Sequence, residues 1–139
     1  MSVSFSDLQS AFEFVSSGEM GENEAYLGRQ SGKIYWHSEF DDNNEELPGD
    51  IDDEKYIAIP DKRELDLGKP LVLDFARDFL RDDYDEVRHI FSRGGAYRRY
   101  KDLLVRRGAL ERWYDFSNKA EEVALREWCA ENGIDLSGT

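Results

Sequence analysis

The stretch Glu24-Ala-Tyr-Leu-Gly-Arg-Gln-Ser-Gly-Lys-Ile-Tyr-Trp-His37 decides the fold, because it holds two β-rich runs around a turn that carries glycine. This pattern predicts a β-hairpin, in which alternate side chains point to opposite faces. Ile34 and Trp36 should face one side, and Tyr35 and His37 the other. A third β-rich run, residues 56–59, ends at Pro60, which cannot continue a strand. The sequence therefore predicts a three-stranded antiparallel sheet.

Helices are predicted on both sides of this sheet along the chain. Before it, Leu8, Ala11, Phe12 and Val15 recur at helical spacing. After it, apolar positions change to a helical period, and glycines or capping residues separate the segments. The predicted later helices start near Pro70, at a capping box formed by Asp83 and Glu86, at Ala96 (ending at Arg107 before Gly108), at Leu110 (ending at Phe116), and at Asn118.

The expected fold class is α+β, with an N-terminal helix and a three-stranded antiparallel sheet followed by about four to five helices. A chain of 139 residues with 40% hydrophobic side chains has the size and composition of a single domain. Its start lacks the features of a signal peptide, and no apolar run is long enough to span a bilayer. Cys129 is the only cysteine, which suits a reducing compartment. We expect a cytoplasmic protein without membrane contact.

The net charge of −13 is unevenly distributed along the chain. Residues 1–92 carry 23 acidic and 9 basic side chains, net −14, whereas residues 93–139 carry 8 and 9, net +1. An exposed acidic loop is predicted at 39–54, where nine acidic residues stand with no basic one. No register of this loop fits the spacing of an EF-hand, so no metal site is expected. Its candidate contact residues are Asp41, Asp42, Glu45, Glu46, Asp52 and Asp53.

The segment 93–112 has the opposite charge, with seven basic and two acidic residues. Basic side chains interleaved with tyrosines suit phosphate contact and base stacking, so binding of RNA or single-stranded DNA is one interpretation. Pairing of these cations with carboxylates of the same chain is the other, because charged helix surfaces are common. The candidate residues on the predicted helix 96–107 are Arg98, Arg99, Lys101, Arg106 and Arg107.

The sequence offers little for catalysis. His37 beside Trp36 could act as a general base with nearby carboxylates, in a pocket that would include Tyr26. Such a histidine is more often a half-exposed strand residue. The sequence has neither phosphate-binding glycine motif, G-x-x-x-x-G-K-[ST] or G-x-G-x-x-G, so no cofactor is expected.

Six strings in order resemble a bacterial family of small acidic proteins of uncharacterised function. They are N-E-A-Y-L at 23–27, S-G-K-I-Y-W at 31–36, Y-I-A-I-P at 56–60, G-A-Y-R-R-Y-K-D-L-L at 95–104, W-Y-D-F at 113–116 and R-E-W-C-A-E-N-G-I at 126–134. The resemblance implies a bacterial, cytoplasmic, single-domain protein. It implies no activity, ligand or catalytic residue.

The charge contrast and the absence of a recognised catalytic motif favour a non-enzymatic module that binds another protein or regulates it. Nucleic-acid binding through helix 96–107 is the alternative, and a small hydrolase that uses His37 is the third hypothesis. If the basic helix and the acidic loop pair with each other, both charged segments are internal architecture. If they do not pair, the surface has two charged poles that a partner can bind.

Overall fold

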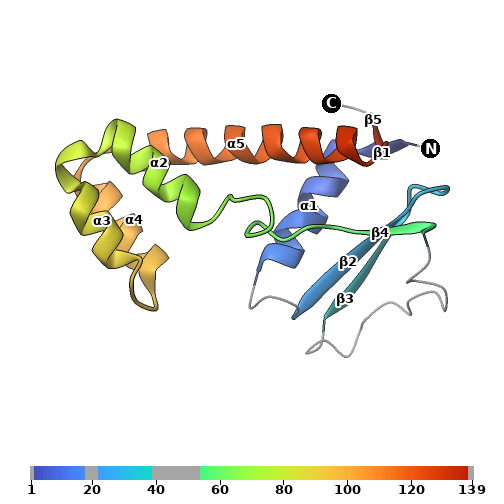
Figure 1. Cartoon of the computed structure of the whole chain (residues 1–139), viewed down its shortest axis with the longest axis horizontal. Coiled ribbons are helices and arrows are strands. Elements are labelled where there is room, and N and C mark those ends of the chain that lie inside the picture. Colours follow the sequence, from blue (N-terminus) through green and yellow to red (C-terminus); the bar gives the residue numbers. More distant parts are fainter. Residues whose placement is uncertain (1, 18–21, 39–53, 138–139) are drawn as a thin grey trace. The chain divides into compact units, whose positions relative to one another are not determined.

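The computed structural model describes residues 2–17, 22–38 and 54–137. The chain divides into two compact units, which we call the sheet unit, residues 1–65 and 125–139, and the helical unit, residues 66–124. The α+β prediction is confirmed: an N-terminal helix and a three-stranded antiparallel sheet precede the C-terminal helices (Figure 1). The prediction of a single domain stays a prediction.

The predicted hairpin is present in the sheet unit. Strand β2 (Asn23–Gly28) pairs antiparallel with β3 (Ile34–Ser38) on one side and with β4 (Tyr56–Ala58) on the other, in the order β3-β2-β4 (Figure 1). The turn between β2 and β3 needs a positive φ at Gly32, whose φ is +74°. The central strand of the sheet is therefore β2.

Helix α1 (Phe5–Ser16) covers one face of this sheet. Its buried residues are the four predicted from the spacing, Leu8, Ala11, Phe12 and Val15. Trp36 lies on the face that α1 covers, since its ring meets Phe14 edge-on at 5.1 Å between centroids. Ala25, which is opposite Trp36 in the register, is buried on the same face.

A short parallel ribbon in the sheet unit has no counterpart in the sequence analysis. Strand β1 (Ser2–Ser4) pairs with β5 (Asp135–Ser137), which joins the two ends of the described chain. Each strand has three residues, which is too short for an alternating pattern to be recognised. The pairing partner is also more than 130 residues away along the sequence, so no local signal marks it.

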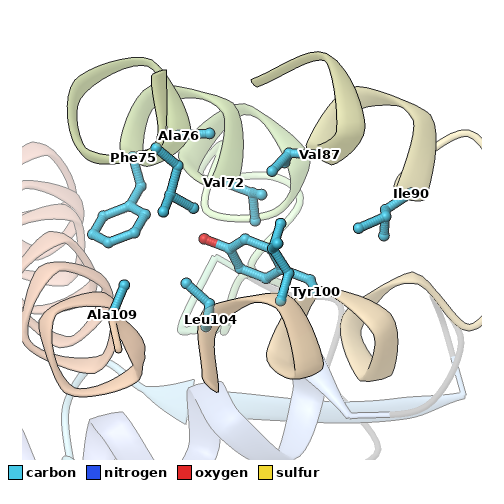
Figure 2. Packing of buried hydrophobic residues seen from close by; sticks show 10 residues of the cluster. Val72, Phe75, Ala76, Val87, Ile90, Tyr100, Leu104 and Ala109 are labelled. Atoms are coloured by element: carbon cyan, nitrogen blue, oxygen red, sulfur yellow. The ribbon is translucent and has the colours of Figure 1, made fainter. Parts of the chain in front are cut away.

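The helical unit is built from α2 (Lys69–Phe79), the 3₁₀ turn η1 (Arg81–Asp83), α3 (Tyr84–Ile90), α4 (Ala96–Arg106) and the first part of α5 (Leu110–Glu131). Pro70 lies in the first turn of α2, as predicted. A cluster of buried residues holds these helices together (Figure 2); its members are Val72, Phe75, Ala76, Leu80, Val87, Ile90, Tyr100, Leu103, Leu104 and Ala109. Gly108, with φ of +65°, ends α4 as expected.

Two local predictions about the helices are wrong. The segments Leu110–Phe116 and Asn118 onward form one helix of 22 residues, because no glycine or proline separates them. Ser117, inside this helix, donates its hydroxyl to the carbonyl of Tyr114 at 3.2 Å and so does not interrupt it. The capping box at Asp83 and Glu86 is also absent: Asp83 makes no capping hydrogen bond and instead accepts two from Arg107.

Candidate functional site

The basic residues of helix α4 are only partly available to a partner. Arg99 donates Nη2 to the carbonyls of Ile90 at 3.3 Å and Gly94 at 2.9 Å, so it closes the C-terminal end of α3. Arg98 and Lys101 are exposed and have no ion pair with any residue that the structure describes. The surface of α4 therefore offers two cations at most without rearrangement.

At the end of α4 the arginines pair with carboxylates of the same unit. Arg107 donates Nε and Nη2 to the two carboxylate oxygens of Asp83, both at 2.9 Å. This bidentate pair raises the pKa of the Arg107 guanidinium. Arg106 approaches Glu86 at 3.5 Å. Part of the basic segment is thus internal architecture, and its partners among the described residues come from residues 83–86.

The candidate residues of that loop, Asp41, Asp42, Glu45, Glu46, Asp52 and Asp53, lie outside the residues that the structure describes. Their pairing with α4 stays untested, and so does their exposure.

The structure separates Trp36 from the other two residues of the predicted pocket. His37 is opposite Glu24, and Tyr26 opposite Tyr35, on the sheet face away from α1. Trp36 lies on the face that α1 covers. Tyr26 lines a cavity in the described part of the sheet unit, and neither Trp36 nor His37 is among the lining residues of that cavity.

This cavity, of about 180 Å³, lies beside the N-terminal half of β2. We call it the carboxylate cavity, because three acidic side chains share its wall with an amide, a phenol and four apolar side chains. Its lining residues are Val15, Asn23, Glu24, Ala25, Tyr26, Ala58, Ile59, Asp61 and Glu64.

The cavity forms where the sheet stops. Strand β4 pairs with β2 through Ala58, which is opposite Tyr26, and the Ile59 N–H still donates to the carbonyl of Ala25 at 2.8 Å. The next residue, Pro60, has no N–H and cannot extend the ladder. Residues 61–64 then turn away from the sheet, which leaves this edge of β2 without a strand neighbour and opens the cavity beside it.

The turn after Pro60 is held by two acidic side chains. Asp61 Oδ1 accepts a hydrogen bond from the Arg63 N–H at 2.7 Å, and Glu64 Oε2 accepts one from the Asp61 N–H at 3.3 Å. This pair of hydrogen bonds resembles a capping box, except that Asp61 Oδ1 accepts from the N–H two residues on instead of three. The turn is tied to α1 because the Lys62 N–H donates to Ser16 Oγ at 3.0 Å. Asp61 and Glu64 are thereby fixed next to the cavity.

Asp61 retains one carboxylate oxygen that no described donor reaches. The residue is 4% exposed, and its Oδ2 has no hydrogen-bond partner. The Arg63 guanidinium lies 3.9 Å from the other oxygen, Oδ1. A buried carboxylate oxygen without a donor is unfavourable and uncommon in folded proteins. It is the most unusual polar atom in the sheet unit.

The three acidic residues of the cavity differ in exposure. Asp61 is buried, Glu24 is half-buried, and Glu64 is exposed. Glu24 accepts a hydrogen bond from the Tyr26 hydroxyl at 3.2 Å. Neither lysine nor arginine is among the described residues that line the cavity, nor is serine, cysteine or histidine. The described wall can therefore attract a cation, but it contains no usual nucleophile with a base.

Among the described residues, no group of three or more histidine, cysteine, aspartate or glutamate side chains is arranged to hold a metal ion. Cys129 is a further candidate that the structure makes unreactive: it is buried, and burial raises the pKa of its thiol.

A second, more open hollow of about 560 Å³ lies in the helical unit. Charges of both signs line it, among them Asp78, Asp82 and Arg81. Arg107 is occupied by Asp83, and the Arg112 guanidinium lies 5.2 Å from the centre of the Phe79 ring. This mixed wall favours no ligand of one charge.

The net charge divides between the two units much as it divides along the sequence. The sheet unit holds 19 acidic and 6 basic side chains, net −13, and the helical unit holds 12 of each, net zero. The whole net charge of the chain therefore belongs to the sheet unit, which also contains the carboxylate cavity.

Sequence reasoning named Tyr26 but missed Asp61 and Glu64 as site residues. The available signal was the motif Pro60-Asp61-Lys62-Arg63-Glu64, in which a strand-ending proline precedes an Asp-x-x-Glu capping pattern. The pattern predicts a fixed turn, but the cavity beside this turn depends on where β4 stops pairing with β2.

No protein-family model matches the chain, and no curated protein and no solved structure matches it either. The family resemblance stated from the sequence strings stays a prediction. Within the described ranges, no helix combines the length and apolar character that crossing a membrane requires.

Proposed function

We propose that this chain is a non-enzymatic module that binds a basic protein partner through its sheet unit. The observation that carries the proposal is the confinement of the net charge, −13 on the sheet unit against zero on the helical unit. A field of one sign over one unit attracts and orients a partner of the opposite sign. The carboxylate cavity provides a shaped feature within that field.

Nucleic-acid binding has less support than protein binding. A phosphate backbone requires several free cations on one surface. The helical unit has no net positive charge, and Arg99 and Arg107 are held by groups of their own unit. Such binding would use Arg98 and Lys101, which are exposed on α4 and have no ion pair with the described residues.

Selection from a library of random peptides displayed on phage, with the full chain immobilised, tests the proposal. We expect enrichment of peptides rich in lysine and arginine, and binding that weakens as salt is raised. A parallel arm measures gel shifts with RNA and single-stranded DNA at low ionic strength, where phosphate contacts must show counterion release.

A charge-reversed pair of variants locates the surface. Glu24→Lys changes the sheet unit and Glu111→Lys, an exposed site on α5, makes the same change in the helical unit. Peptide binding should fall several-fold in the first variant and little in the second. The proposal would be overturned by any of three results. These are equal losses of peptide binding in both variants, enrichment of neutral or acidic peptides, and a salt-sensitive gel shift with RNA in the absence of peptide binding.

A further inference from the structure

We propose that the carboxylate cavity is a subsite for one arginine side chain of the basic partner. The inference rests on the proposed function and adds to it the residue that the partner inserts and the groups that receive it. The arginine stem would lie against the apolar wall, and its guanidinium would meet the carboxylates of Glu24, Asp61 and Glu64.

The size of the cavity fits a side chain. Sites for drug-sized molecules have volumes of about 300–1,000 Å³, and one water in the liquid fills about 30 Å³. The carboxylate cavity, at about 180 Å³, is smaller than the first range and several times larger than a single water. It suits a group of a few heavy atoms that reaches in from outside.

The wall has the two chemical parts that a long basic side chain requires. Val15, Ala25, Ala58 and Ile59 supply apolar surface, and the cation nearest to Asp61, the Arg63 guanidinium at 3.9 Å from Oδ1, is not part of the described lining. Lysine and arginine side chains bury their methylene stems on apolar surface and keep the charged group against polar atoms. Glu24, Asp61 and Glu64, all lining residues, give the charged group several acceptors.

The unpaired oxygen of Asp61 points to a donor supplied from outside the described chain. Its Oδ1 is already used by the Arg63 N–H, so the turn alone explains why Asp61 is fixed but not why Oδ2 lacks a partner. Asp61 is also one of the lining residues of the cavity. A donor that enters the cavity and reaches Oδ2 after a small side-chain adjustment would remove the cost of burying this oxygen.

Arginine suits this arrangement better than lysine. The acceptors come from three residues on two separate segments, β2 and the turn after Pro60. A guanidinium has five N–H donors spread over a planar fork, whereas an ammonium is a compact point charge with three. The fork can therefore serve acceptors in different directions at once. Arginine is also enriched at protein interfaces, where lysine is depleted.

Titration of the ¹⁵N-labelled full chain with capped pentapeptides tests the inference. The probes are Gly-Gly-Arg-Gly-Gly, the same peptide with lysine, and the same peptide with citrulline, which has the shape of arginine but no charge. We expect the arginine peptide to shift the backbone amides of residues 23–26 and 58–64, with an affinity about tenfold above that of the citrulline peptide.

Matched variants identify the groups involved. Glu24→Gln and Glu64→Gln each keep the shape of the side chain and an acceptor oxygen, and each should weaken arginine binding about tenfold by loss of one charged contact. Glu13→Gln is the control, because Glu13 is exposed on α1 in the same unit and does not line the cavity. It removes the same charge and should change affinity little.

The outcomes separate this inference from the proposed function. Equal binding of arginine and citrulline peptides, or equal losses in Glu13→Gln and Glu24→Gln, would overturn the arginine subsite. If library selection still enriches basic peptides in that case, the proposed function survives with its contact elsewhere. A lysine peptide that binds more tightly than the arginine peptide would also contradict the choice of guanidinium.

Discussion

The two units of the molecule share one irregularity and differ in what surrounds it. Each has one buried side-chain atom, among the described residues, that lacks a hydrogen-bond partner: Asp61 Oδ2 in the sheet unit and the Tyr100 hydroxyl in the helical unit. Asp61 lines a cavity with two further carboxylates. Tyr100 is enclosed by apolar side chains (Figure 2).

The surroundings decide what each unpaired atom means. Figure 2 shows the Tyr100 hydroxyl pointing inward, toward the side of the cluster where Phe75 and Ala109 lie. Burial there raises the pKa of Tyr100 well above its usual value. The buried members of this cluster are apolar apart from Tyr100 itself, so the unpaired hydroxyl costs stability. Asp61, beside an acidic cavity, can be satisfied by a ligand.

The largest expected effect comes from opening the closed cluster of the helical unit. Phe75 is fully buried, and its ring lies within 5.3 Å, centroid to centroid, of the rings of Phe79, Trp113 and Phe116. Phe75→Ala should lower the free energy of unfolding by about 3–5 kcal/mol, because it removes buried apolar surface and leaves a cavity. Urea denaturation followed by circular dichroism measures this loss.

Phe79→Ala is the matched control, one turn further along α2, where the side chain is 44% exposed. Phe79→Ala should lower the free energy of unfolding clearly less than Phe75→Ala does. Hydrogen exchange adds the comparison between units: in Phe75→Ala, amides of α2 and α4 should exchange faster, with a smaller change in β2. Equal losses in both variants would mean that the cluster is not the main source of stability in the helical unit.

The second effect should be a gain in stability. Tyr100→Phe removes the unpaired hydroxyl and keeps the ring, which meets Phe91 at 5.4 Å and Trp113 at 5.2 Å. We expect the free energy of unfolding to rise by about 1–2 kcal/mol, because an unsatisfied buried polar group is no longer desolvated. Thermal unfolding at neutral pH measures it.

The dependence on pH provides a separate check of the same residue. The pKa of Tyr100 is raised in the folded protein, so the folded state holds this proton more tightly than the unfolded state. The contribution of this tyrosine is fully present below its unfolded pKa of about 10 and is lost as the pH rises above it. The free energy of unfolding of Tyr100→Phe should therefore fall less steeply, as the pH rises above about 10, than that of the original chain. An unchanged alkaline profile would show that Tyr100 is not the titrating group.

The sequence predicted the regular elements well because their signals are local. The hairpin, the β4 run ending at Pro60, the buried face of α1 and the end of α4 at Gly108 each depend on neighbouring residues, and each is observed. The errors occurred where local signals mislead. Asn118 and Glu121 look like a helix start but lie inside α5, and Asp83 is used by Arg107 and not by a cap.

The candidate site was less predictable because it depends on contacts between distant segments. Val15, Glu24 and Asp61 come from α1, β2 and the turn after Pro60, and only the tertiary structure brings them to one cavity. The unequal distribution of charge was visible from the sequence, but the residues at which the acidic unit begins and ends were not. Residues 125–139 belong with the sheet unit through the pairing of β1 with β5, which has no local signature.

The smallest expected change in stability tests whether the two unpaired atoms really differ. Asp61→Asn keeps an oxygen that can accept from the Arg63 N–H, since asparagine and aspartate cap equally well, so the free energy of unfolding should change by less than about 1 kcal/mol. Binding of the arginine peptide should nevertheless fall about tenfold, because the most buried carboxylate of the cavity has lost its charge. Tyr100→Phe, in the other unit, should leave that binding unchanged. If Asp61→Asn stabilises the fold as much as Tyr100→Phe and does not weaken binding, the Asp61 oxygen has no role beyond its cost in stability. A loss of binding at nearly constant stability, by contrast, would show that the cavity keeps an unpaired carboxylate oxygen because the partner supplies its donor.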